Sequence, residues 1–561
     1  MSPLTGRVLV LGSDTRSFLT VVRSMGRLGF EVHAAWCPVT APALASRYVH
    51  TVHTLPAYDV EALCELLSRV AFDLVIPCDD FAILPLQVNR ATLPAHTRVY
   101  LLDDEAFAIA SDKAKTYELA ASLGIPLARQ RAVASLEELD AAATEFGWPL
   151  VLKPASSVTV ASPGSRHAVR KAWNSEEARA LAKPPLLVQQ NFIGVGVGVE
   201  VLCREGEVLT AFQHERVHEP MTGGGSSYRK SVTLSPALLD AASKLMRAMQ
   251  YTGVGMAEFK VNHQTGEWIL IEINGRFWGS LPLSVAAGAD FPRYLYEMLV
   301  LDRRSFPETY RAGVYARNWM LDLRWMARNL LTRRSDPTLM SKPLASVVRE
   351  FVHLPREHSD TLTADDPAPA LREVRQLLTR GTRPATDLLR RGRLYCDAVA
   401  AAGQARKILF VCKGNICRSP FAEAYLRKLA PPYVTVESAG YLRLPGRPSP
   451  SAAIDAARTF GIDLQGHRSQ VLTPRMVDRA DAIFIFERDQ EQELLGWFPA
   501  SAAKMHYVSA LARRGRTGTR DPWGAETDEF LRVYREIAAA LAAVCHTGAL
   551  RRHPLATSPQ Y

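Results

Sequence analysis

Short apolar runs alternate with helical patterns over about the first hundred residues. Residues 8–12 and 74–77 are apolar and rich in β-branched side chains, whereas residues 17–28 carry apolar positions at helical spacing. Alternating strands and helices are typical of an α/β unit with a parallel sheet. We therefore expect a first α/β domain over residues 1–110.

Residues 111–305 mix helices with a larger number of strand-like runs. Many of these strands follow one another without an intervening helix, which favours antiparallel pairing and an α+β domain. The strand-like runs cover residues 149–153, 186–190, 198–203, 208–213, 256–261 and 268–273.

Residues 306–405 change character. Helical patterns at 319–331 and 371–378 are interrupted by Asp-Pro, Lys-Pro and Arg-Pro pairs. We interpret the segment as a helical connector with an exposed Pro/Asp-rich stretch near 355–370. Between Arg303 and Arg406 there are 19 Lys and Arg against 11 Asp and Glu, so most of the net charge of +10 lies in the middle of the chain.

A second α/β pattern follows over residues 406–547 and opens with the apolar strand 408–411. The remaining residues, 548–561, are polar and are expected to be disordered. The expected fold class is therefore a multidomain combination of α/β and α+β units, with the connector between the second and third domains.

Composition restricts the cellular setting more than the chemistry. The eight cysteines show no regular framework and no zinc-type spacing, which favours a reducing compartment. Neither a signal-like apolar stretch nor a run of eighteen apolar residues is present, so we expect a cytoplasmic protein without a transmembrane segment. No nucleic-acid motif accompanies the basic surplus, so we expect no nucleic-acid partner. Solvated helices, an anionic membrane surface or an acidic protein partner would each account for the charge of the connector.

A phosphate-binding pattern follows strand 408–411 directly. Cys412 is separated by five residues from Arg418, Ser419 and a proline follow, and a helical pattern begins there. A loop between a strand and a helix N-terminus presents backbone N–H groups and a positive dipole end, which bind phosphate and favour a thiolate. The guanidinium of Arg418 can then hold two phosphate oxygens in a planar fork.

Supporting residues complete this candidate site. Gly414 would permit a tight backbone, Asn415 would brace the loop by hydrogen bonds, and Ser419 would donate to the Cys412 sulfur. Asp521, which precedes a proline and a tryptophan, is the candidate general acid that protonates the leaving oxygen.

These motifs resemble the low-molecular-weight protein tyrosine phosphatase family over residues 407–547. The resemblance is carried by Val411-Cys-Lys-Gly-Asn-Ile-Cys-Arg-Ser-Pro420, Glu437-Ser-Ala-Gly440, Gly466-His-Arg-Ser469 and Asp521-Pro. It implies Cys412 as nucleophile, Arg418 as transition-state ligand, Asp521 as general acid and a phosphocysteine intermediate, with Ser438 and His467 in support. Cys417 is then either a redox partner of Cys412 or a small buried residue. The segment after Gly440 lacks the family's aromatic wall residue, so the substrate is phosphotyrosine or a related phosphomonoester.

A second, more dispersed set of residues lies within 111–305. Lys113 opens a helix and Lys153 ends a strand, while Glu258, Glu272 and Asn274 fall on two strand-like runs. Glu272 and Asn274 are two residues apart and therefore point to one face of their strand. Carboxylate and amide oxygens suit Mg²⁺ bridged to phosphates, because Mg²⁺ takes few protein ligands.

The order of these residues resembles the ATP-grasp superfamily, in its carbamoyl-phosphate-synthase-like and carboxylate–amine ligase branch. The resemblance implies ATP and Mg²⁺ as cofactors, with Glu258, Glu272 and Asn274 as metal ligands. The ATP-binding residues that it implies are Lys113, Lys153, Gln189, Gln190, Phe192, Ile193, Gly224, Ser226 and Arg276.

Together the two resemblances predict a bifunctional enzyme. An ATP-grasp ligase would form an acylphosphate from a carboxylate, and an amine of a small molecule or peptide would attack it. The phosphatase domain would act on a phosphorylated substrate. The alternative is a phosphatase regulated by a nucleotide-binding module without catalytic activity. The sequence does not indicate the substrates of the ligase or the oligomeric state.

Overall fold

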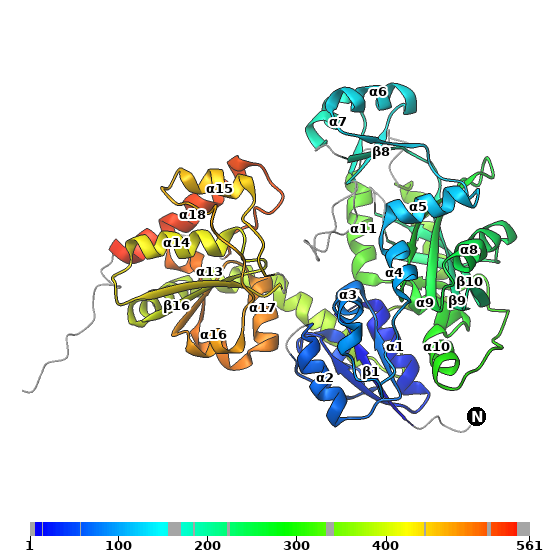
Figure 1. The fold of residues 1–561 in the computed structure, drawn as a ribbon, viewed down its shortest axis with the longest axis horizontal. Coiled ribbons are helices and arrows are strands. Elements are labelled where there is room, and N and C mark those ends of the chain that lie inside the picture. The colour runs from blue at the N-terminus through cyan, green and yellow to red at the C-terminus, as the bar shows by residue number, and fades with distance from the viewer. Residues whose placement is uncertain are drawn as a thin grey trace, which may run out of the picture. The chain divides into compact units, whose positions relative to one another are not determined.

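We describe the chain from a computed structural model. The described residues are 6–13, 15–55, 58–154, 170–182, 186–220, 225–332, 341–442, 445–512 and 518–546, with the side chains of 154, 380–390 and 546 left out. The chain forms two compact units, residues 1–37 with 41–372, and residues 38–40 with 373–561 (Figure 1). Each unit is described by itself. None of the described helices is long and apolar enough to cross a membrane.

The first unit begins with a parallel sheet of order β3-β2-β1-β4. Its central strand alternates strictly, with Val8 and Val10 in one core and Leu9 and Leu11 in another, so both faces of the sheet are covered. This confirms the α/β unit predicted for the N-terminus. The elements are β1 (Arg7–Leu11), α1 (Arg16–Arg27), β2 (Glu31–Ala35), β3 (Val49–His53), α2 (Val60–Arg69), β4 (Leu74–Pro77), α3 (Asp80–Val88), α4 (Asp104–Ser111) and α5 (Lys113–Ser122).

A small sheet of order β5-β8-β6-β7 follows, and its paired strands are antiparallel. Helices α6 and α7 pack on it through Leu139, Ala142 and Ala178. The strands predicted at 149–153 and 186–190 are confirmed as β6 and β8. The elements are β5 (Gln130–Val133), α6 (Leu136–Phe146), β6 (Leu150–Pro154), β7 (Arg170–Ala172), α7 (Ser175–Leu181) and β8 (Leu186–Gln190).

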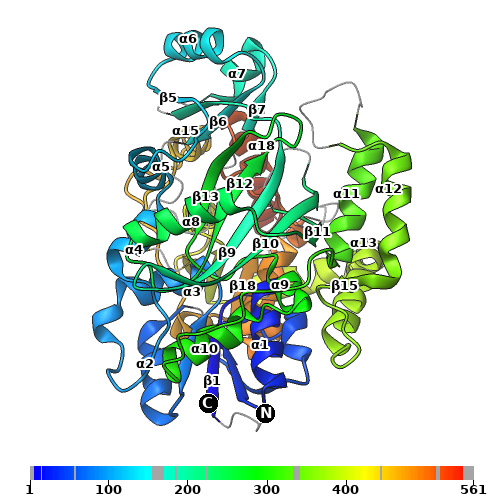
Figure 2. The same ribbon diagram turned by 90° about the vertical axis from the view of Figure 1, so that its right-hand side faces the viewer.

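The main sheet of the first unit has seven strands in the order β13-β12-β9-β10-β11-β14-β15 (Figure 2). All neighbours are antiparallel except β14 and β15. The pairing of β12 with β13 is irregular between Glu258 and Phe259, and such bulges re-aim side chains next to functional sites. The elements are β9 (Val195–Arg204), β10 (Glu207–His218), β11 (Tyr228–Ser231), α8 (Pro236–Ala248), β12 (Gly253–Val261), β13 (Trp268–Asn274), α9 (Leu281–Ala287), α10 (Phe291–Val300), β14 (Tyr315–Arg317) and β15 (Glu357–Ser359).

The first two thirds of the segment expected to be a helical connector are instead part of the first unit. Residues 306–372 belong to the first unit, and β14 and β15 extend its main sheet. The predicted helix at 319–331 is present as α11 (Trp319–Leu331), and α12 (Leu344–Glu350) follows. Helix α13 (Ala368–Gln404) continues through position 384, where the Arg-Pro pair was expected to interrupt it.

The Pro/Asp-rich stretch near 355–370 is not simply exposed, as the sequence had indicated. Asp360 and Asp366 are only 2% and 1% exposed. Asp366 accepts hydrogen bonds from Arg23 and Ser46 of the first domain, and Asp360 pairs with the buried guanidinium of Arg229 on β11. Acidic residues therefore enter this core because buried arginines need counter-charges.

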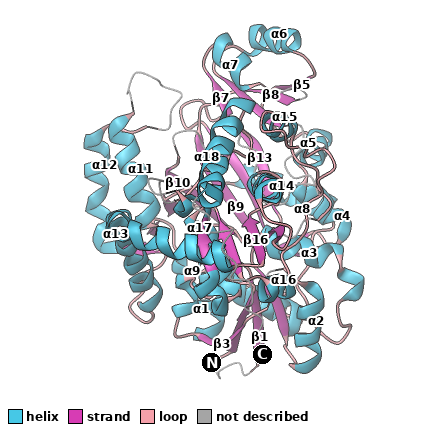
Figure 3. Cartoon of the chain, turned by 90° about the vertical axis from the view of Figure 1, so that its left-hand side faces the viewer, coloured by secondary structure: helices cyan, strands magenta, loops and turns pink. Residues whose placement is uncertain are grey.

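The second unit is a parallel sheet of order β17-β16-β18-β19 with helices on both faces (Figure 3). Ile408 and Phe410 of the central strand face α14 and α18, whereas Leu409 and Val411 face the opposite core. This confirms the predicted C-terminal α/β domain. Its elements are β16 (Lys407–Cys412), α14 (Arg418–Leu429), β17 (Thr435–Gly440), α15 (Ser451–Arg458), α16 (Pro474–Arg479), β18 (Ala482–Ile485), α17 (Arg488–Trp497), β19 (Met505–Tyr507) and α18 (Thr527–His546).

Candidate functional site

The loop between β16 and α14 surrounds the sulfur of Cys412. The Cys412 Sγ lies 3.0 Å from the hydroxyl of Ser419, and the backbone N–H of Asn415 donates to it over 3.2 Å. Cys412 is the last residue of β16, and Arg418 is the first residue of α14. The sulfur is therefore placed by a strand end on one side and a helix N-terminus on the other, as the sequence predicts.

Asn415 determines the conformation of the loop. It has a φ of 51°, and its side-chain N–H₂ donates to Ser419 Oγ and Ser438 Oγ over 3.0 and 2.7 Å. Its carbonyl accepts a 2.7 Å hydrogen bond from the ring N–H of His467. We expected Gly414 to provide the tight backbone, but the left-handed residue is Asn415, which tolerates that conformation.

Two residues that the sequence did not single out for this purpose also shape the loop. Gly440, at the end of β17, leaves no room for a side chain, because a Cβ there would lie 2.8 Å from the backbone nitrogen of Asn415. The Arg447 guanidinium donates to the Gly414 carbonyl over 2.9 Å. The loop is thus packed between β17 and the chain that follows it.

Arg418 lies under the loop with 1% of its surface exposed. Its guanidinium donates to the carbonyl of Thr519 and to Glu487, and it lies 2.9 Å from the carboxylate of Asp521. Burial opposes the charge, but Asp521 and Glu487 outweigh it and raise the pKa of Arg418. A substrate phosphate would meet a permanently charged, already oriented guanidinium.

Asp521 is brought next to Arg418 as expected and remains accessible. Its side chain is 35% exposed, and Trp523, two residues later, is 42% exposed at the same turn. Glu487, immediately before α17, is the residue of this cluster that the sequence analysis missed. It carries no local motif, and only the fold places it beside Arg418.

Cys417 is buried in the core that α14 and α18 share. It is 4% exposed, burial raises the pKa of its thiol, and its carbonyl accepts a hydrogen bond from Tyr534. Both Cys412 and Cys417 are free thiols in the structure.

A second cluster of charges lies across β12 and β13 of the first unit. Glu258 and Glu272 are register partners on these strands, and Asn274 donates to Glu272 over 3.4 Å. Arg216 pairs with Glu258 over 2.6 Å, and Lys113 pairs with Glu272 over 2.8 Å. Burial raises the pKa of Glu258. At Glu272 burial acts in the same direction, but Lys113 outweighs it and lowers the pKa.

Lys153 joins this cluster from β6. Its ammonium donates to the hydroxyl of Tyr117 over 3.0 Å, and the residue as a whole is 7% exposed. Burial and the nearby charge of Lys113 lower the pKa of Lys153 to about 7. A lysine in this state readily gains a proton when an anion arrives.

The remaining predicted residues of this cluster lie around it. Arg276, directly after β13, pairs with Asp80 at the start of α3 over 2.6 Å. The carbonyl of Ser226 accepts a hydrogen bond from Arg16 at the start of α1. The first α/β domain therefore closes one side of the cluster. Gly224 lies outside the described residues.

The predicted hinge follows β8. Gln189 and Gln190 end this strand and pair with β5 and β6, while Phe192 and Ile193 follow it, Ile193 with 58% of its surface exposed. The Gln189 side chain is buried and donates to Gln130 over 3.3 Å. The hinge is thus next to the strand that carries Lys153.

The residues present fit a magnesium ion that phosphates help to hold. Glu258, Glu272 and Asn274 offer only oxygen and amide donors, and two cations already neutralise the carboxylates. Among the described residues, no three Asp, Glu, His or Cys side chains form a group that could hold a metal ion. Mg²⁺ commonly takes one or two carboxylates and completes its shell with water and substrate phosphate.

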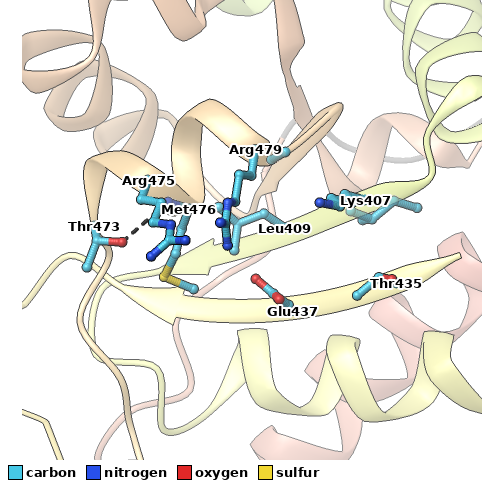
Figure 4. A pocket seen from close by; sticks show the side chains of 10 residues that line it. Lys407, Leu409, Thr435, Glu437, Thr473, Arg475, Met476 and Arg479 are labelled. Atoms are coloured by element: carbon cyan, nitrogen blue, oxygen red, sulfur yellow. Dashed lines mark hydrogen bonds between the residues drawn. The ribbon is translucent and has the colours of Figure 1, made fainter.

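A pocket of about 110 Å³ opens in the second unit at the other end of β16 from Cys412 (Figure 4). Lys407, Arg475 and Arg479 line it together with Glu437. Its lining extends along β16 as far as Leu409, three residues or roughly 10 Å from Cys412, and includes no residue of the Cys412 loop. We assign it no role.

Comparison with known proteins gives separate matches for the two units. The family model of low molecular weight phosphotyrosine protein phosphatases matches residues 407–553. The probable low molecular weight protein-tyrosine-phosphatase EpsP of Ralstonia nicotianae is 43% identical over 125 residues, which cover 22% of this chain and 83% of the relative.

The front of the chain matches a model described as ATP-grasp in the biosynthetic pathway with Ter operon, over residues 182–317. The formate-dependent phosphoribosylglycinamide formyltransferase of Synechococcus sp. (strain RCC307) is 27% identical over 371 residues, covering 62% of this chain and 91% of the relative. A biotin carboxylase structure from Campylobacter jejuni, in complex with an ATP analogue, aligns with 18% identity and a TM-score of 0.44, covering 55% of this chain and 74% of that one.

Proposed function

Because this chain belongs, through residues 407–553, to the low molecular weight phosphotyrosine protein phosphatase family and carries an ATP-grasp domain, we propose a bifunctional enzyme. One unit would hydrolyse a phosphomonoester, and the other would ligate a carboxylate to an amine at the expense of ATP. The observation that best supports the phosphatase is the convergence of Cys412, Arg418 and Asp521 at one strand end.

In the proposed phosphatase reaction the substrate dianion enters the loop and takes the place of Asp521 beside Arg418. The Cys412 thiolate attacks phosphorus while the bond to the leaving oxygen breaks, and Asp521 gives that oxygen its proton. A water then attacks the phosphocysteine, gives its proton to Asp521 and releases the thiolate. Ser419, 3.0 Å from the sulfur, stabilises the departing charge.

Replacement of Asp521 by alanine tests the proposed proton donor. Turnover of phenyl phosphate, whose leaving oxygen needs a proton, should fall about 10²–10³-fold, within the usual range for general acid catalysis. Turnover of an aryl phosphate with a strongly acidic phenol should fall much less, because that phenolate leaves without protonation. Steady-state kcat for a series of aryl phosphates measures the difference.

Asp528→Ala is the matched control, since Asp528 lies in the first turn of α18 and not beside Arg418. The Asp528 variant should turn over every aryl phosphate of the series with the kcat of the wild type. An equal loss for good and poor leaving groups in the Asp521 variant would reject the acid role and leave only an effect on phosphate binding.

For the ligase we propose that Lys113 and Lys153 bind ATP phosphates, and that Glu258, Glu272 and Asn274 hold Mg²⁺. Support comes from the ion pair of Lys113 with Glu272 and from the hydrogen bond that Asn274 donates to Glu272. When bound, Mg²⁺ would neutralise phosphate charge and orient the γ-phosphoryl group. Lys113 would exchange Glu272 for a phosphate oxygen. The acceptor carboxylate would become an acylphosphate, and the amine would then displace phosphate.

Nucleotide binding should take up a proton because Lys153 has a pKa of about 7 in the free protein. Phosphate beside the ammonium raises that pKa in the complex. A pKa raised by binding favours binding at low pH, so the affinity should be level below pH 7. Above pH 7 it should fall by up to about tenfold per pH unit, until the pKa of the complex is passed.

Titration calorimetry with Mg-ATP at pH 8, in two buffers of different ionisation enthalpy, measures this uptake. We expect up to about one proton per nucleotide, as one lysine requires. Lys153→Met should abolish the uptake and weaken binding, whereas Lys244→Met, on the exposed surface of α8, should change neither. An affinity independent of pH from 6 to 8.5 would contradict the role of Lys153.

A further inference from the structure

Exposed apolar side chains gather on one part of the first unit. Of the 23 large apolar side chains that are exposed among the described residues, nine lie between Leu321 and Leu354. These residues belong to α11, to α12 and to the turn that follows α12. Single exposed apolar residues are ordinary, but a group of them on neighbouring segments is typical of a binding surface.

Helix α11 buries two polar residues beside Trp325 and leaves several leucines exposed. Its polar residues Asp322 and Asn329 are 0% and 3% exposed, whereas Leu323, Leu330 and Leu331 are 53%, 61% and 85% exposed. The inward residues Asp322, Trp325 and Asn329 are spaced by three, four and seven positions, as a helical face requires. The leucines are therefore exposed because they lie on the opposite side of a regular helix, and not because the helix end is frayed.

Hydrogen bonds hold the inward face in this orientation. Asp322 accepts from the Ser227 hydroxyl over 2.7 Å and lies 2.8 Å from the ring nitrogen of His218. Asn329 donates to the Lys342 carbonyl and accepts from the Lys342 N–H, both over 2.9 Å. Rotating α11 to bury its leucines would leave these buried polar groups without partners, at about 1–3 kcal/mol for each group.

Helix α12 presents a second apolar stripe beside the first. Leu344 and Val348 of α12 and Val352 of the turn that follows it are spaced by four residues and are 45%, 61% and 71% exposed, whereas Val347 is buried. Glu350, on the inward side, lies 2.7 Å from both His218 and Lys342. The two helices lie side by side in both views (Figures 2 and 3).

The charges around these stripes are basic. Arg324, Arg328, Arg349 and Arg356 are exposed. The two acids of the described residues 319–332 and 341–356, Asp322 and Glu350, are engaged on the inward side with His218. The outer surface thus combines leucine and valine with arginine and shows little opposing charge.

We propose that this apolar-basic face is a docking surface for an anionic phospholipid membrane. It consists of Leu323, Leu330, Leu331, Leu344, Val348, Val352, Arg324, Arg328, Arg349 and Arg356. Apolar residues that enter the acyl boundary and arginines that meet lipid phosphates are the pattern of interfacial helices. Helix α11 has 13 residues, about 20 Å at 1.5 Å per residue, so it lies in the interface and does not cross it. A second copy fits less well, because arginines would face arginines.

Vesicle flotation of the full chain tests the proposal. We expect the protein to float with phosphatidylcholine vesicles that contain phosphatidylglycerol, and to float less with phosphatidylcholine alone or at high salt. The double variant Leu323→Glu/Leu330→Glu should lower the bound fraction at least about tenfold, since it places charge where apolar contact is needed. Arg324→Gln/Arg328→Gln should reduce the preference for phosphatidylglycerol while leaving the leucines in place.

Val88→Glu is the matched control, because Val88 is 68% exposed on α3, outside the apolar-basic face. It should float like the wild type, and all variants should keep the wild-type melting temperature. Absence of flotation, or equal flotation of the double leucine variant, would overturn the proposal. So would a dimer in solution that the leucine variant dissociates, since the face would then bind a second copy.

Discussion

Replacing Cys412 by serine is expected to lower kcat for p-nitrophenyl phosphate by at least about 10⁴-fold, because a protonated serine hydroxyl is a much weaker nucleophile than a thiolate. The substitution changes one atom. Serine can keep the contacts to Ser419 and to the backbone N–H of Asn415, so the loop should retain its shape. The loss would therefore report on nucleophilicity and not on folding.

Cys417→Ser serves as the control within the same loop. Cys417 is buried and its thiol takes no part in the proposed reaction, so this variant should stay within about tenfold of the wild type. Turnover is measured with inorganic phosphate release at substrate saturation. Retention of more than a few per cent of activity in Cys412→Ser would mean that phosphorus is attacked directly by water.

Glu272→Gln is expected to lower ATP consumption by the front unit by at least about 10²-fold, since it removes one of two carboxylates available to Mg²⁺ and leaves Lys113 unpaired. ADP release would be followed with a panel of amino acids and short peptides as carboxylate and amine donors. A Cys412→Ser background would preserve any phosphorylated product that the second unit removes.

The outcome separates an enzyme from a regulatory module. Glu267→Gln, in the exposed turn before β13, should leave ADP release unchanged. ADP release that does not depend on Glu272 would contradict the metal assignment. Nucleotide binding without ADP release under any acceptor, together with a change in phosphatase kcat, would favour a module that senses ATP.

The phosphatase loop was predictable because its parts are local. Cys412, Asn415, Arg418 and Ser419 are neighbours in a strand–loop–helix unit, so their spacing brings them together around one loop. Glu487 was not predictable, since it lies 69 residues from Arg418 and belongs to no motif. Its contact follows from the order of the strands in the sheet, which a single sequence does not state.

The assignment of residues 306–372 to a connector failed for a different reason. Strands β14 and β15 have three residues each, too few to show a period of two. In the sequence, Asp360 and Asp366 look like exposed loop residues. Only the structure shows that they pair with the buried residues Arg229 and Arg23. The helix at 319–331 was predicted with the correct bounds, yet its apolar face points outward, because buried polar partners fix its rotation.

The buried acids of residues 357–366 set the point at which the front half could be separated from the rest of the chain. A fragment ending at residue 305, where the ATP-grasp pattern stops, would lack Asp360 and Asp366, the counter-charges of Arg229 and Arg23, and would uncover the surface that these residues bury. Loss of one partner of a buried ion pair costs about 3–5 kcal/mol where the other charge stays buried, against a typical total stability of about 5–15 kcal/mol. An autonomous front half therefore has to extend to residue 372, so that gene fusions or splits that preserve it are confined to α13.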